Sequence, residues 1–421
     1  MNMIKFALLG TAAIAAVSVS ARATEASDIA ALKAQVEALS AQVAASTTDV
    51  PAGFQLVSVT TAPTIVAPGM TLDKNYAATA TQIGVMPTAD APASTVVQWS
   101  GFVRAALSYV NAPISGGTSQ TVNDTYSDVR ARAEIKVTGT TDTAVGEVGA
   151  WVKLRAEAGY YDTTSHTGWG SVGHTNRGSA GVTSPGAWGW WKMTPELSLG
   201  GGMDGSIANN GYGYDGACSC YYTDNANASW SHDGDPVQMR LTYASGPMTA
   251  AIALEDYANN NSAGGGNNYN EFGIAAKFNY SGDAFSAGLA GGYWPTAFTG
   301  IGQAAAWNIN AGVKVGLSDM GFLSVNAGLG EDDHYTDNTY WRANAFASLN
   351  LSEQAHVELG VNRLSYTTDT LHNDKSQTAV LAGLYYEPVK QLTIGLEGEY
   401  TKYDSYNNAT VYADLVTVFR F

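Results

Sequence analysis

The sequence has few basic residues and, beyond its start, no long apolar run. Its 21 Lys and Arg stand against 37 Asp and Glu, a formal charge of -16. This balance argues against nucleic acid as a partner, because phosphate binding needs a basic surface. After residue 23 there is no stretch of 18 consecutive apolar residues, so we expect no membrane-spanning helix. The P-loop, HExxH and GxSxG motifs are also missing, which argues against the enzyme classes that they mark.

Glycine and aromatic residues are abundant instead. The chain holds 46 Gly, 23 Tyr and 10 Trp among 421 residues, and its apolar residues are spread in alternation with polar ones. This composition is untypical of a helical soluble enzyme and typical of a protein made of many strands. If such a chain enters a membrane it must do so as a barrel, because only helices and closed barrels satisfy their backbone groups in lipid.

The first 95 residues divide into three segments. Residues 1–23 have the pattern of a secretory signal peptide, with Lys5, an apolar core and a small-x-small site at residues 21–23. Residues 24–46 place apolar side chains at alternating spacings of three and four, which predicts a coiled-coil helix that associates with its own copies; packing on its own domain is the alternative. Residues 47–95 are rich in Pro, Thr and Ala and predict an extended linker, with a short strand at residues 54–59.

Regular alternation begins at residue 97. In residues 97–109, Val103 and Leu107 share one face, whereas Arg104 and Ser108 share the other. Residues 129–137 and 148–156 repeat this pattern, and so does the last stretch, which ends at Phe421. In a soluble sandwich the charged face would meet solvent, whereas in a membrane barrel the apolar face turns outward and the charges line water. One strand alone does not distinguish these two arrangements.

The connections between strands do distinguish them. Short links alternate with longer ones, which is the up-and-down plan of an outer-membrane barrel with tight periplasmic turns and long external loops. The seven short links are residues 139–144, 194–196, 245–247, 281–283, 318–321, 352–355 and 388–391. The eight longer ones are residues 111–126, 161–185, 207–236, 258–268, 295–304, 331–338, 367–375 and 404–408. The sequence therefore predicts an all-β fold, a 16-stranded antiparallel transmembrane β-barrel over residues 96–421, wide enough for an aqueous channel.

With these features the chain resembles the porins of alphaproteobacteria, the general trimeric porins. The resemblance rests on the leader, the heptad segment, the opening strand WSGFVRAALSYV, the strand count and the terminal FRF. It implies a homotrimer in the outer membrane of a Gram-negative cell, with the third long loop folded into each pore. It also implies passive diffusion of small hydrophilic solutes and ions, without a cofactor or metal.

The third long connection, residues 207–236, is the longest, and we expect it to narrow the pore. Acidic side chains on this loop would face basic side chains on the wall and create a transverse field. The acidic residues are Asp215, Asp224, Asp233 and Asp235. The basic residues are Arg104, Arg130, Arg132, Lys136, Lys153, Arg155 and Arg240. In the alternative interpretation these charges only hydrate the lumen and the loop lies outside.

The same loop carries both cysteines, Cys218 and Cys220. In an oxidising compartment we interpret them as a small, strained disulfide that stiffens the loop. Free thiols, or a metal site that includes His232, are the alternatives, and a zinc site lacks a second pair of ligands.

Three other functions are alternatives to passive diffusion. An enzyme is disfavoured because five of the six histidines fall in predicted external loops and none lies beside a candidate Ser nucleophile. The carboxylates of Glu397 and Glu399 are expected to form a charge cluster with Arg420 on the next strand. A sugar-specific channel would need Trp151, Trp188 and Trp190 on the lumen side, but Trp188 and Trp190 are expected to face lipid as part of an aromatic girdle. A structural tether to the cell wall is the third alternative.

The predicted external loops are acidic, with Asp124, Asp333 and Asp369 among their residues. Within a Debye length such loops enrich cations at the channel mouth. We also expect them to bridge to lipopolysaccharide through divalent ions. A weak cation preference follows, unless the wall arginines dominate at the narrowest point.

Overall fold

The computed structural model describes residues 57–85, 95–113, 123–158, 182–213, 221, 236–256, 272–299, 302–332, 338–366, 376–404 and 408–421. The chain forms two units, residues 1–57 and 58–421, and the described residues belong almost wholly to the second. The predicted signal peptide and coiled-coil helix lie outside the described residues. Within the described part of the chain, no helix is long and apolar enough to cross a membrane.

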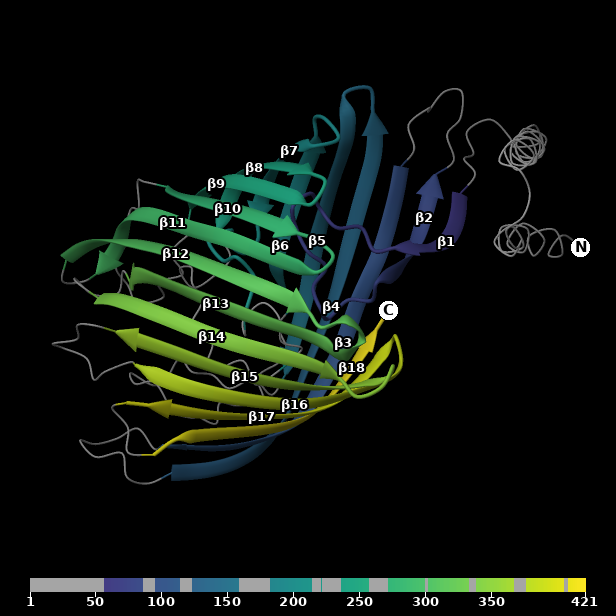
Figure 1. Ribbon diagram of the computed structural model, residues 1–421. Coiled ribbons are helices and arrows are strands. Elements are labelled where there is room, and N and C mark those ends of the chain that lie inside the picture. Colours follow the sequence, from purple (N-terminus) through teal and green to yellow (C-terminus); the bar gives the residue numbers. More distant parts are fainter. Residues whose placement is uncertain are drawn as a thin grey trace, which may run out of the picture. The chain divides into compact units, whose positions relative to one another are not determined.

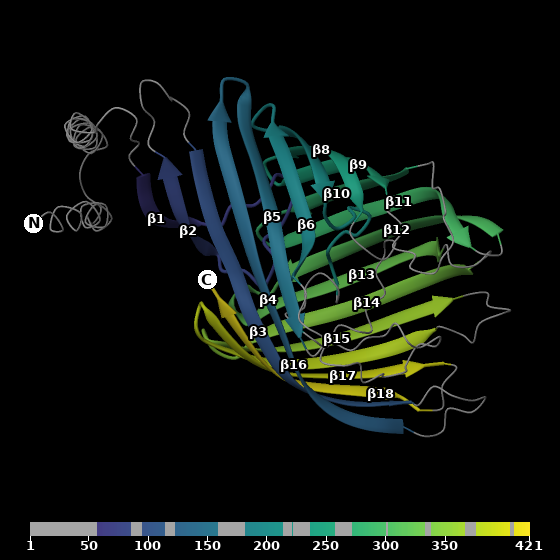
Figure 2. The ribbon, with the colours of Figure 1, turned by 180° about the vertical axis from the view of Figure 1, so that it is seen from behind.

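Sixteen strands, β3 to β18, form one closed antiparallel sheet (Figures 1 and 2). They are β3 (Thr95–Pro113), β4 (Asn123–Thr143), β5 (Gly146–Ala158), β6 (Val182–Lys192), β7 (Leu197–Met203), β8 (Val237–Ser245), β9 (Met248–Asp256), β10 (Gly273–Ser281), β11 (Phe285–Thr299), β12 (Gly302–Gly316), β13 (Gly321–Asp332), β14 (Asn338–Asn350), β15 (Ala355–Tyr366), β16 (Gln377–Val389), β17 (Leu392–Tyr403) and β18 (Thr410–Arg420). Each strand pairs with the next, and β18 closes the ring by pairing with β3, as in Leu415↔Leu107. The predicted 16-stranded barrel is confirmed.

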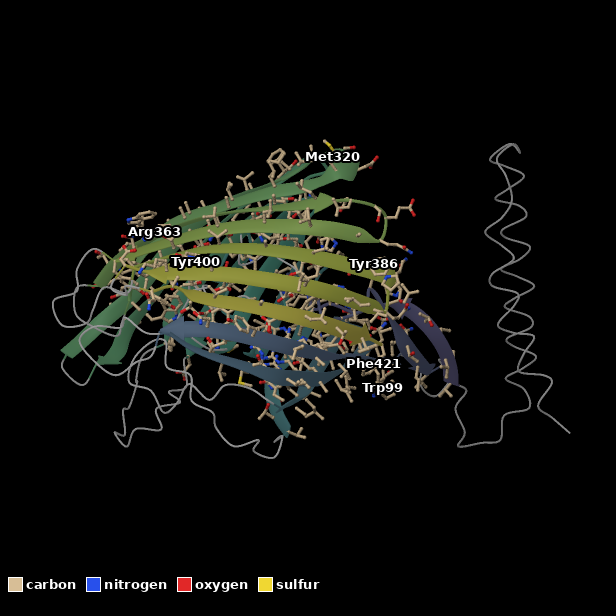
Figure 3. All side chains as sticks on the ribbon, turned by 90° about the horizontal axis from the view of Figure 1, so that it is seen from below. Trp99, Met320, Arg363, Tyr386, Tyr400 and Phe421 are labelled. Atoms are coloured by element: carbon tan, nitrogen blue, oxygen red, sulfur yellow. The ribbon has the colours of Figure 1, made fainter. Side chains whose placement is uncertain are left out.

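The side-chain alternation has the orientation of a membrane barrel. Along β3, Leu107 is 56% exposed on the outside, whereas Arg104 on the other face is 5% exposed. The aromatic residues Trp99, Tyr386 and Phe421 lie on the outside near the end with the short turns (Figure 3). Such an apolar exterior bounded by aromatic residues is the pattern of a barrel that meets lipid outside and water inside.

One connection is shorter than predicted. Residues 295–304 were expected to form a long external link, but β11 and β12 continue through them and only residues 300–301 separate the two strands. The register shifts between Trp294 and Ala297, and Pro295 lies in this irregular stretch. Proline has no N–H for the ladder and is found in strands at bulges and edges, so here it bends a strand rather than ending it.

Two further strands precede the barrel, in the part of the chain predicted as a linker. β1 (Val57–Pro63), which overlaps the short strand predicted at residues 54–59, pairs with β2 (Thr79–Val85). β2 pairs with the first residues of β3, as in Ile83↔Val97. β18 occupies the same edge of β3 from Phe102 onward. The β1–β2 hairpin therefore covers the part of the edge that β18 leaves free, which removes unpaired backbone groups from the seam.

The external ends of β15 and β17 are joined by an ion pair, and this pair gives a pH-dependent prediction. Arg363 donates from Nη1 and Nη2 to the two carboxylate oxygens of Asp404, at 2.8 and 2.5 Å. Hydrogen bonding by Arg363 is the largest effect on the Asp404 carboxyl, and it holds the pKa below its ordinary value. Asp404 in the unfolded chain has a pKa of about 4. Above that pH the ionised carboxylate stabilises the folded state fully, and this stabilisation is lost as pH falls through the lower pKa that Asp404 has in the folded state.

We therefore expect hydrogen exchange at the external ends of β15 and β17 to increase below about pH 4, after correction for the intrinsic exchange rate. The Asp404→Asn variant should show faster exchange at pH 7 and little further change on acidification. Equal acid sensitivity in the wild type and the variant would contradict this assignment.

Candidate functional site: the narrowed lumen

The inner wall of the barrel is polar and charged. Buried inward side chains include Arg130, Glu134, Lys136, Glu255 and Asp414. Every second residue of each strand must face this side, so the same alternation that makes the exterior apolar makes the interior polar. Two segments of chain run across this wall and narrow the lumen. The first is residues 64–78, which we call the inserted segment, and the second is the described start of the third long connection, residues 204–213.

The inserted segment begins and ends at one point on the β1–β2 hairpin. Its two ends are joined by a hydrogen bond from Thr64 N to Ala78 O of 3.0 Å. At its entry, Ile65 N donates to Oε1 of Gln98 on β3 at 2.7 Å, and Gln98 Nε2 donates back to Pro63 O at 2.8 Å. Further in, Gly69 adopts a φ of +74° against Thr242 of β8, a conformation that glycine adopts without strain.

The far part of the inserted segment is held by charged residues of the wall. Tyr76 Oη donates to Glu134 of β4. Arg104 Nη1 donates to Asn75 Oδ1 at 3.3 Å, and Arg420 Nε donates to Lys74 O at 3.2 Å. Burial raises the pKa of Tyr76, and the hydrogen bond to Glu134 and the charge of that carboxylate raise it further. Tyr76 therefore stays a neutral donor across the physiological range.

Apolar side chains of the inserted segment pack on two sides of the lumen. Ala67, Ile65 and Met70 contact the tryptophan cluster of β5 and β6. Leu72 and Tyr76 contact another cluster that includes Tyr385 of β16 and two valines of β18. Since only β3 and β4 separate β18 from β5 in the ring, and Arg104 of β3 and Glu134 of β4 also bond to the segment, the segment lies along this part of the inner wall and occupies lumen space.

The third long connection lies inside the barrel where it is described, as predicted. Ser206 Oγ and Ile207 N donate to the carboxylate of Glu255 on β9, at 2.8 and 3.1 Å. Asn210 N donates to Asn310 of β12, and Gly213 N donates to Ser324 of β13, at 3.1 and 2.7 Å. The loop therefore follows the inner wall from β9 to β13.

The described residue Tyr221 extends this path to the last strands. Tyr221 N donates to Glu397 of β17 at 2.7 Å, and its hydroxyl accepts from Arg420 Nη2 at 2.5 Å. Burial raises the pKa of Tyr221 to about 12, against the opposing effect of the Arg420 charge. Like Tyr76, it is neutral at physiological pH and serves as a fixed polar anchor.

The predicted basic residues fall into two groups. Arg130, Arg132 and Arg155 lie on the wall in ion pairs with strand carboxylates: Arg130 with Asp414 at 2.7 Å, Arg155 with Glu134 at 2.7 Å, and Arg132 with Glu157. The wall thus neutralises much of its own charge, a pairing that the sequence did not indicate. Arg104 contacts the inserted segment. Lys136, Lys153 and Arg240 converge instead on one pocket.

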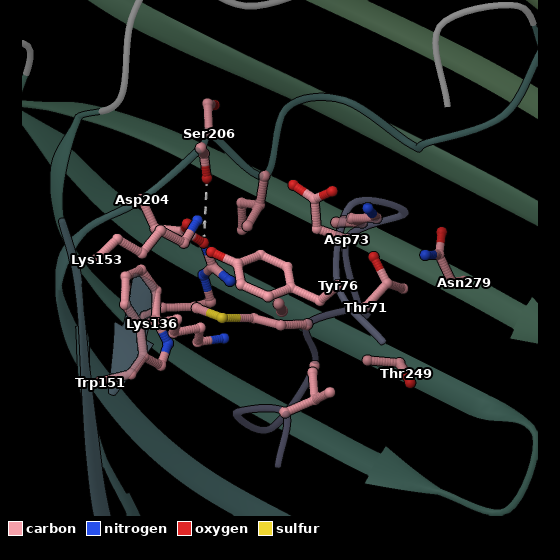
Figure 4. Close-up of a pocket in the computed structure, with 18 residues that line it drawn as sticks. Thr71, Asp73, Tyr76, Lys136, Trp151, Lys153, Asp204, Ser206, Thr249 and Asn279 are labelled. Carbon is pink, nitrogen blue, oxygen red and sulfur yellow. Dashed lines mark hydrogen bonds between the residues drawn. The ribbon is translucent and has the colours of Figure 1, made fainter. Parts of the chain in front are cut away.

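This pocket lies between the inserted segment, the start of the third loop and the wall (Figure 4). Besides the three predicted cations it contains Lys277 of β10, and two carboxylates reach it, from Asp73 of the inserted segment and Asp204 of the loop. Lys277 alternates with the outward Ile274, Ala276 and Phe278, so inward placement could have been inferred from the sequence. The position of Asp73 at the pocket could not have been inferred from the sequence, because residues 64–78 have no strand periodicity.

The tryptophans correct one prediction. Trp188 and Trp190 were expected to face lipid, but each is 4% exposed and lies on the inner face with Trp151. Trp188 is directly opposite Trp151 in the β5–β6 register, and opposed residues share a face. Trp190 lies against Gly149, where an added Cβ would be 2.0 Å from the ring. The next residue, Trp191, is 38% exposed and faces outward.

The remaining predictions concern the loop and the last strands. Asp215, Asp224, Asp233, Asp235, Cys218 and Cys220 lie outside the described residues. The expected pairing of Arg420 with Glu397 and Glu399 is wrong, because Asp414 lies opposite Glu397 and Tyr412 opposite Glu399. The register of β17 and β18 places Arg420 near Thr393. Arg420 Nη1 donates to the Thr393 hydroxyl at 2.7 Å.

Comparison with known proteins agrees with this architecture. DcaP, an outer membrane channel of Acinetobacter baumannii, is 14% identical with a TM-score of 0.57, covering 80% of this chain and 99% of that chain. Outer-membrane OmpT of Vibrio cholerae is 11% identical with a TM-score of 0.52, covering 78% and 98%. A mutant of the Rh. blastica porin is 15% identical with a TM-score of 0.48, covering 77% and 100%.

A search of curated protein sequences found no match. A family match covers most of the chain: residues 93–418 match the family described as the porin subfamily. This stretch contains all sixteen strands of the ring except the last two residues of β18. The chain belongs to the alphaproteobacterial porin family and forms a passive-diffusion channel of the outer membrane.

Proposed function

We propose that the protein is a homotrimeric general porin, exported by its signal peptide, that passes small hydrophilic solutes and ions. The observation that carries this proposal is the inverted polarity of the closed barrel. Leu107 and Leu415 face outward, at 56% and 50% exposed, while Arg104 and Asp414 are buried on the inner face. A soluble barrel would instead fill its centre with apolar side chains.

The narrowest part of the path lies where the inserted segment and the third loop approach the wall. Lys136, Lys153 and Arg240 act there as pore-lining cations, with Asp204 and Asp73 as the facing carboxylates. The ion-paired Arg130, Arg132 and Arg155 contribute less to the field that a solute meets, because each is close to a carboxylate. The acidic residues of the later part of the loop stay a prediction.

A sugar-specific channel is the second candidate, and the inward position of Trp151, Trp188 and Trp190 is what favours it. A sugar slide needs exposed ring faces, however, and these rings are covered by Ala67 and Met70 of the inserted segment. Arg240 also lies 4.8 Å from the centre of the Trp188 ring. General diffusion therefore fits the geometry better.

Enzymatic activity and a tether role are not proposed. His356 is the histidine within the described residues, and it stacks on Tyr385 with ring centres 5.1 Å apart and approaches Glu358 at 3.4 Å. These partners hold the ring in place on the wall. Lipopolysaccharide contact through divalent ions remains a proposal for the acidic external ends, where Glu331 and Asp404 already pair with Trp307 and Arg363.

Reconstitution in planar lipid bilayers tests the proposed function. We expect steady open currents that appear in groups of three equal steps, because each subunit of a trimer carries its own pore. Neutral sugars should enter protein-containing vesicles at rates that fall smoothly with their size. Folded protein that gives no conductance would refute the channel, and block by one sugar alone would favour the specific channel.

A further inference from the structure

The lumen gathers uncompensated positive charge in one place. Lys136, Lys153, Arg240 and Lys277, from four different strands, line the pocket between the inserted segment and the third loop (Figure 4). The chain as a whole carries 21 basic against 37 acidic residues. A cluster of four cations around one pocket is therefore opposite in sign to the net charge of the chain.

Their arrangement is electrostatically unfavourable. Lys136 on β4 lies directly opposite Lys153 on β5, and like charges at opposed positions of an antiparallel pair destabilise it. Lys277 and Arg240 also repel one another. Unlike Arg130 and Arg155, none of the three lysines forms an ion pair with any residue that the structure describes.

The ammonium groups are nevertheless held in position. Lys136 Nζ and Lys153 Nζ lie 4.9 and 4.8 Å from the centre of the Trp151 ring, a cation–π geometry. The Arg240 guanidinium donates to Gln238 at 2.8 Å and to Gly205 O at 3.2 Å. These contacts hold Lys136, Lys153 and Arg240 in position without neutralising them.

The carboxylates at the pocket only partly offset this charge. Asp204 and Asp73 are the two that line it, and Asp73 is engaged by the backbone and side-chain amides of Asn75, both at 2.8 Å. Four cations against two carboxylates leave a formal excess of two positive charges. A ligand that carries at least two negative charges would balance the pocket.

We propose that this pocket is a binding site for small polyanionic solutes whose charged groups are phosphates or carboxylates. The proposal rests on the proposed function and names the solute class that its narrowest part favours. The inserted segment forms one wall of the site, so a bound anion lies between Tyr76 and Asp73 on one side and the lysines of the barrel on the other. Binding there raises the local concentration of the anion and assists its passage.

Block of single-channel chloride current by inorganic phosphate or succinate tests the proposal. At constant ionic strength we expect millimolar concentrations of either anion to reduce the current of the wild-type protein. The Lys136→Gln/Lys277→Gln double variant should raise the half-blocking concentration about tenfold, since two charges facing the ligand are removed. Block by both anions indicates a site for general polyanions, and block by one alone identifies the preferred group.

Lys314→Gln is the matched control, because Lys314 faces the lumen from β12 but lies over the Phe322 ring, 3.8 Å from its centre, outside this pocket. Its half-blocking concentration should match that of the wild type. A conducting wild type that neither anion blocks, or an equal shift in the control, would overturn the proposal. Block by spermidine instead of anions would overturn it too, since Asp73 and Asp204 would then be the ligands. Absence of any conductance would count against the channel itself.

Discussion

Replacing residues 65–77 by a two-residue Asn-Gly turn is expected to raise the single-channel conductance roughly twofold or more, because the segment removed occupies part of the lumen. The replacement is feasible because Thr64 N and Ala78 O are hydrogen-bonded at 3.0 Å, so the two ends already meet. β1 and β2 would then continue into a tight hairpin, and the sixteen-stranded ring would keep all of its strand pairs. Bilayer recordings at fixed salt measure the change directly.

The Tyr76→Phe variant distinguishes the effect of the inserted segment being present from the effect of its hydrogen bond to the wall. It removes the hydroxyl that donates to Glu134 and leaves the rest of the segment in place. We expect an unchanged mean conductance with added current noise, as the segment moves more freely against the wall. If the turn replacement leaves conductance at the wild-type level while the protein remains folded, the inserted segment does not lie in the conducting path.

Arg130→Ala is expected to destabilise the folded barrel by about 3–5 kcal/mol, the typical cost of removing one partner from a buried ion pair. The side chains of Arg130 and Asp414 are 6% and 0% exposed. Arg130 also donates through Nε to Ser108 of β3 at 2.8 Å, so this one side chain connects β4, β3 and β18 across the closure of the ring. Its loss leaves the Asp414 carboxylate buried beside the seam without its cation.

Arg132→Ala provides the comparison within the same strand. Arg132 and Glu157 are 18% and 26% exposed, so solvent screens this pair more than it screens Arg130 and Asp414, and the expected loss of stability is smaller. Urea unfolding in detergent micelles, followed by tryptophan fluorescence, measures both variants. Restoration of stability in the Arg130→Gln/Asp414→Asn double variant would show that the unpaired charge causes the loss. Equal destabilisation by Arg130→Ala and Arg132→Ala would contradict this explanation.

The sequence predicted the ring because its signal is local. Alternation in residues 97–109 follows from the side-chain period of two in a strand. Together with the short links, it indicates which side chains face lipid. Pro295 misled the prediction of the length of the connection between β11 and β12, because a bulge and a loop share the same residue preferences. The direction of Trp188 was missed because it depends on the register with β5, which alternating Ala, Gly and Trp residues do not specify.

The interior of the lumen was harder to predict. Tyr76 and Asp73 lie in a segment that has the composition of a linker. A segment that meets water inside a pore needs no apolar periodicity, so the sequence did not indicate that this one lies in the lumen. Arg130 and Asp414 are 284 residues apart in sequence, and only closure of the ring brings them together. The lysine pocket was only partly predictable, because alternation indicates that Lys136, Lys153 and Lys277 face inward but does not show that they meet at one pocket.

The inserted segment enters from the end of the barrel that carries the short turns, because β2 pairs with the first residues of β3. The third long connection enters from the opposite, external end, where it follows β7, so the two mouths carry different inserted segments. An ion driven inward and an ion driven outward therefore encounter the obstruction and the lysines in reverse order. The channel has a built-in polarity along its axis, which gives its current–voltage curve a physical reason to rectify.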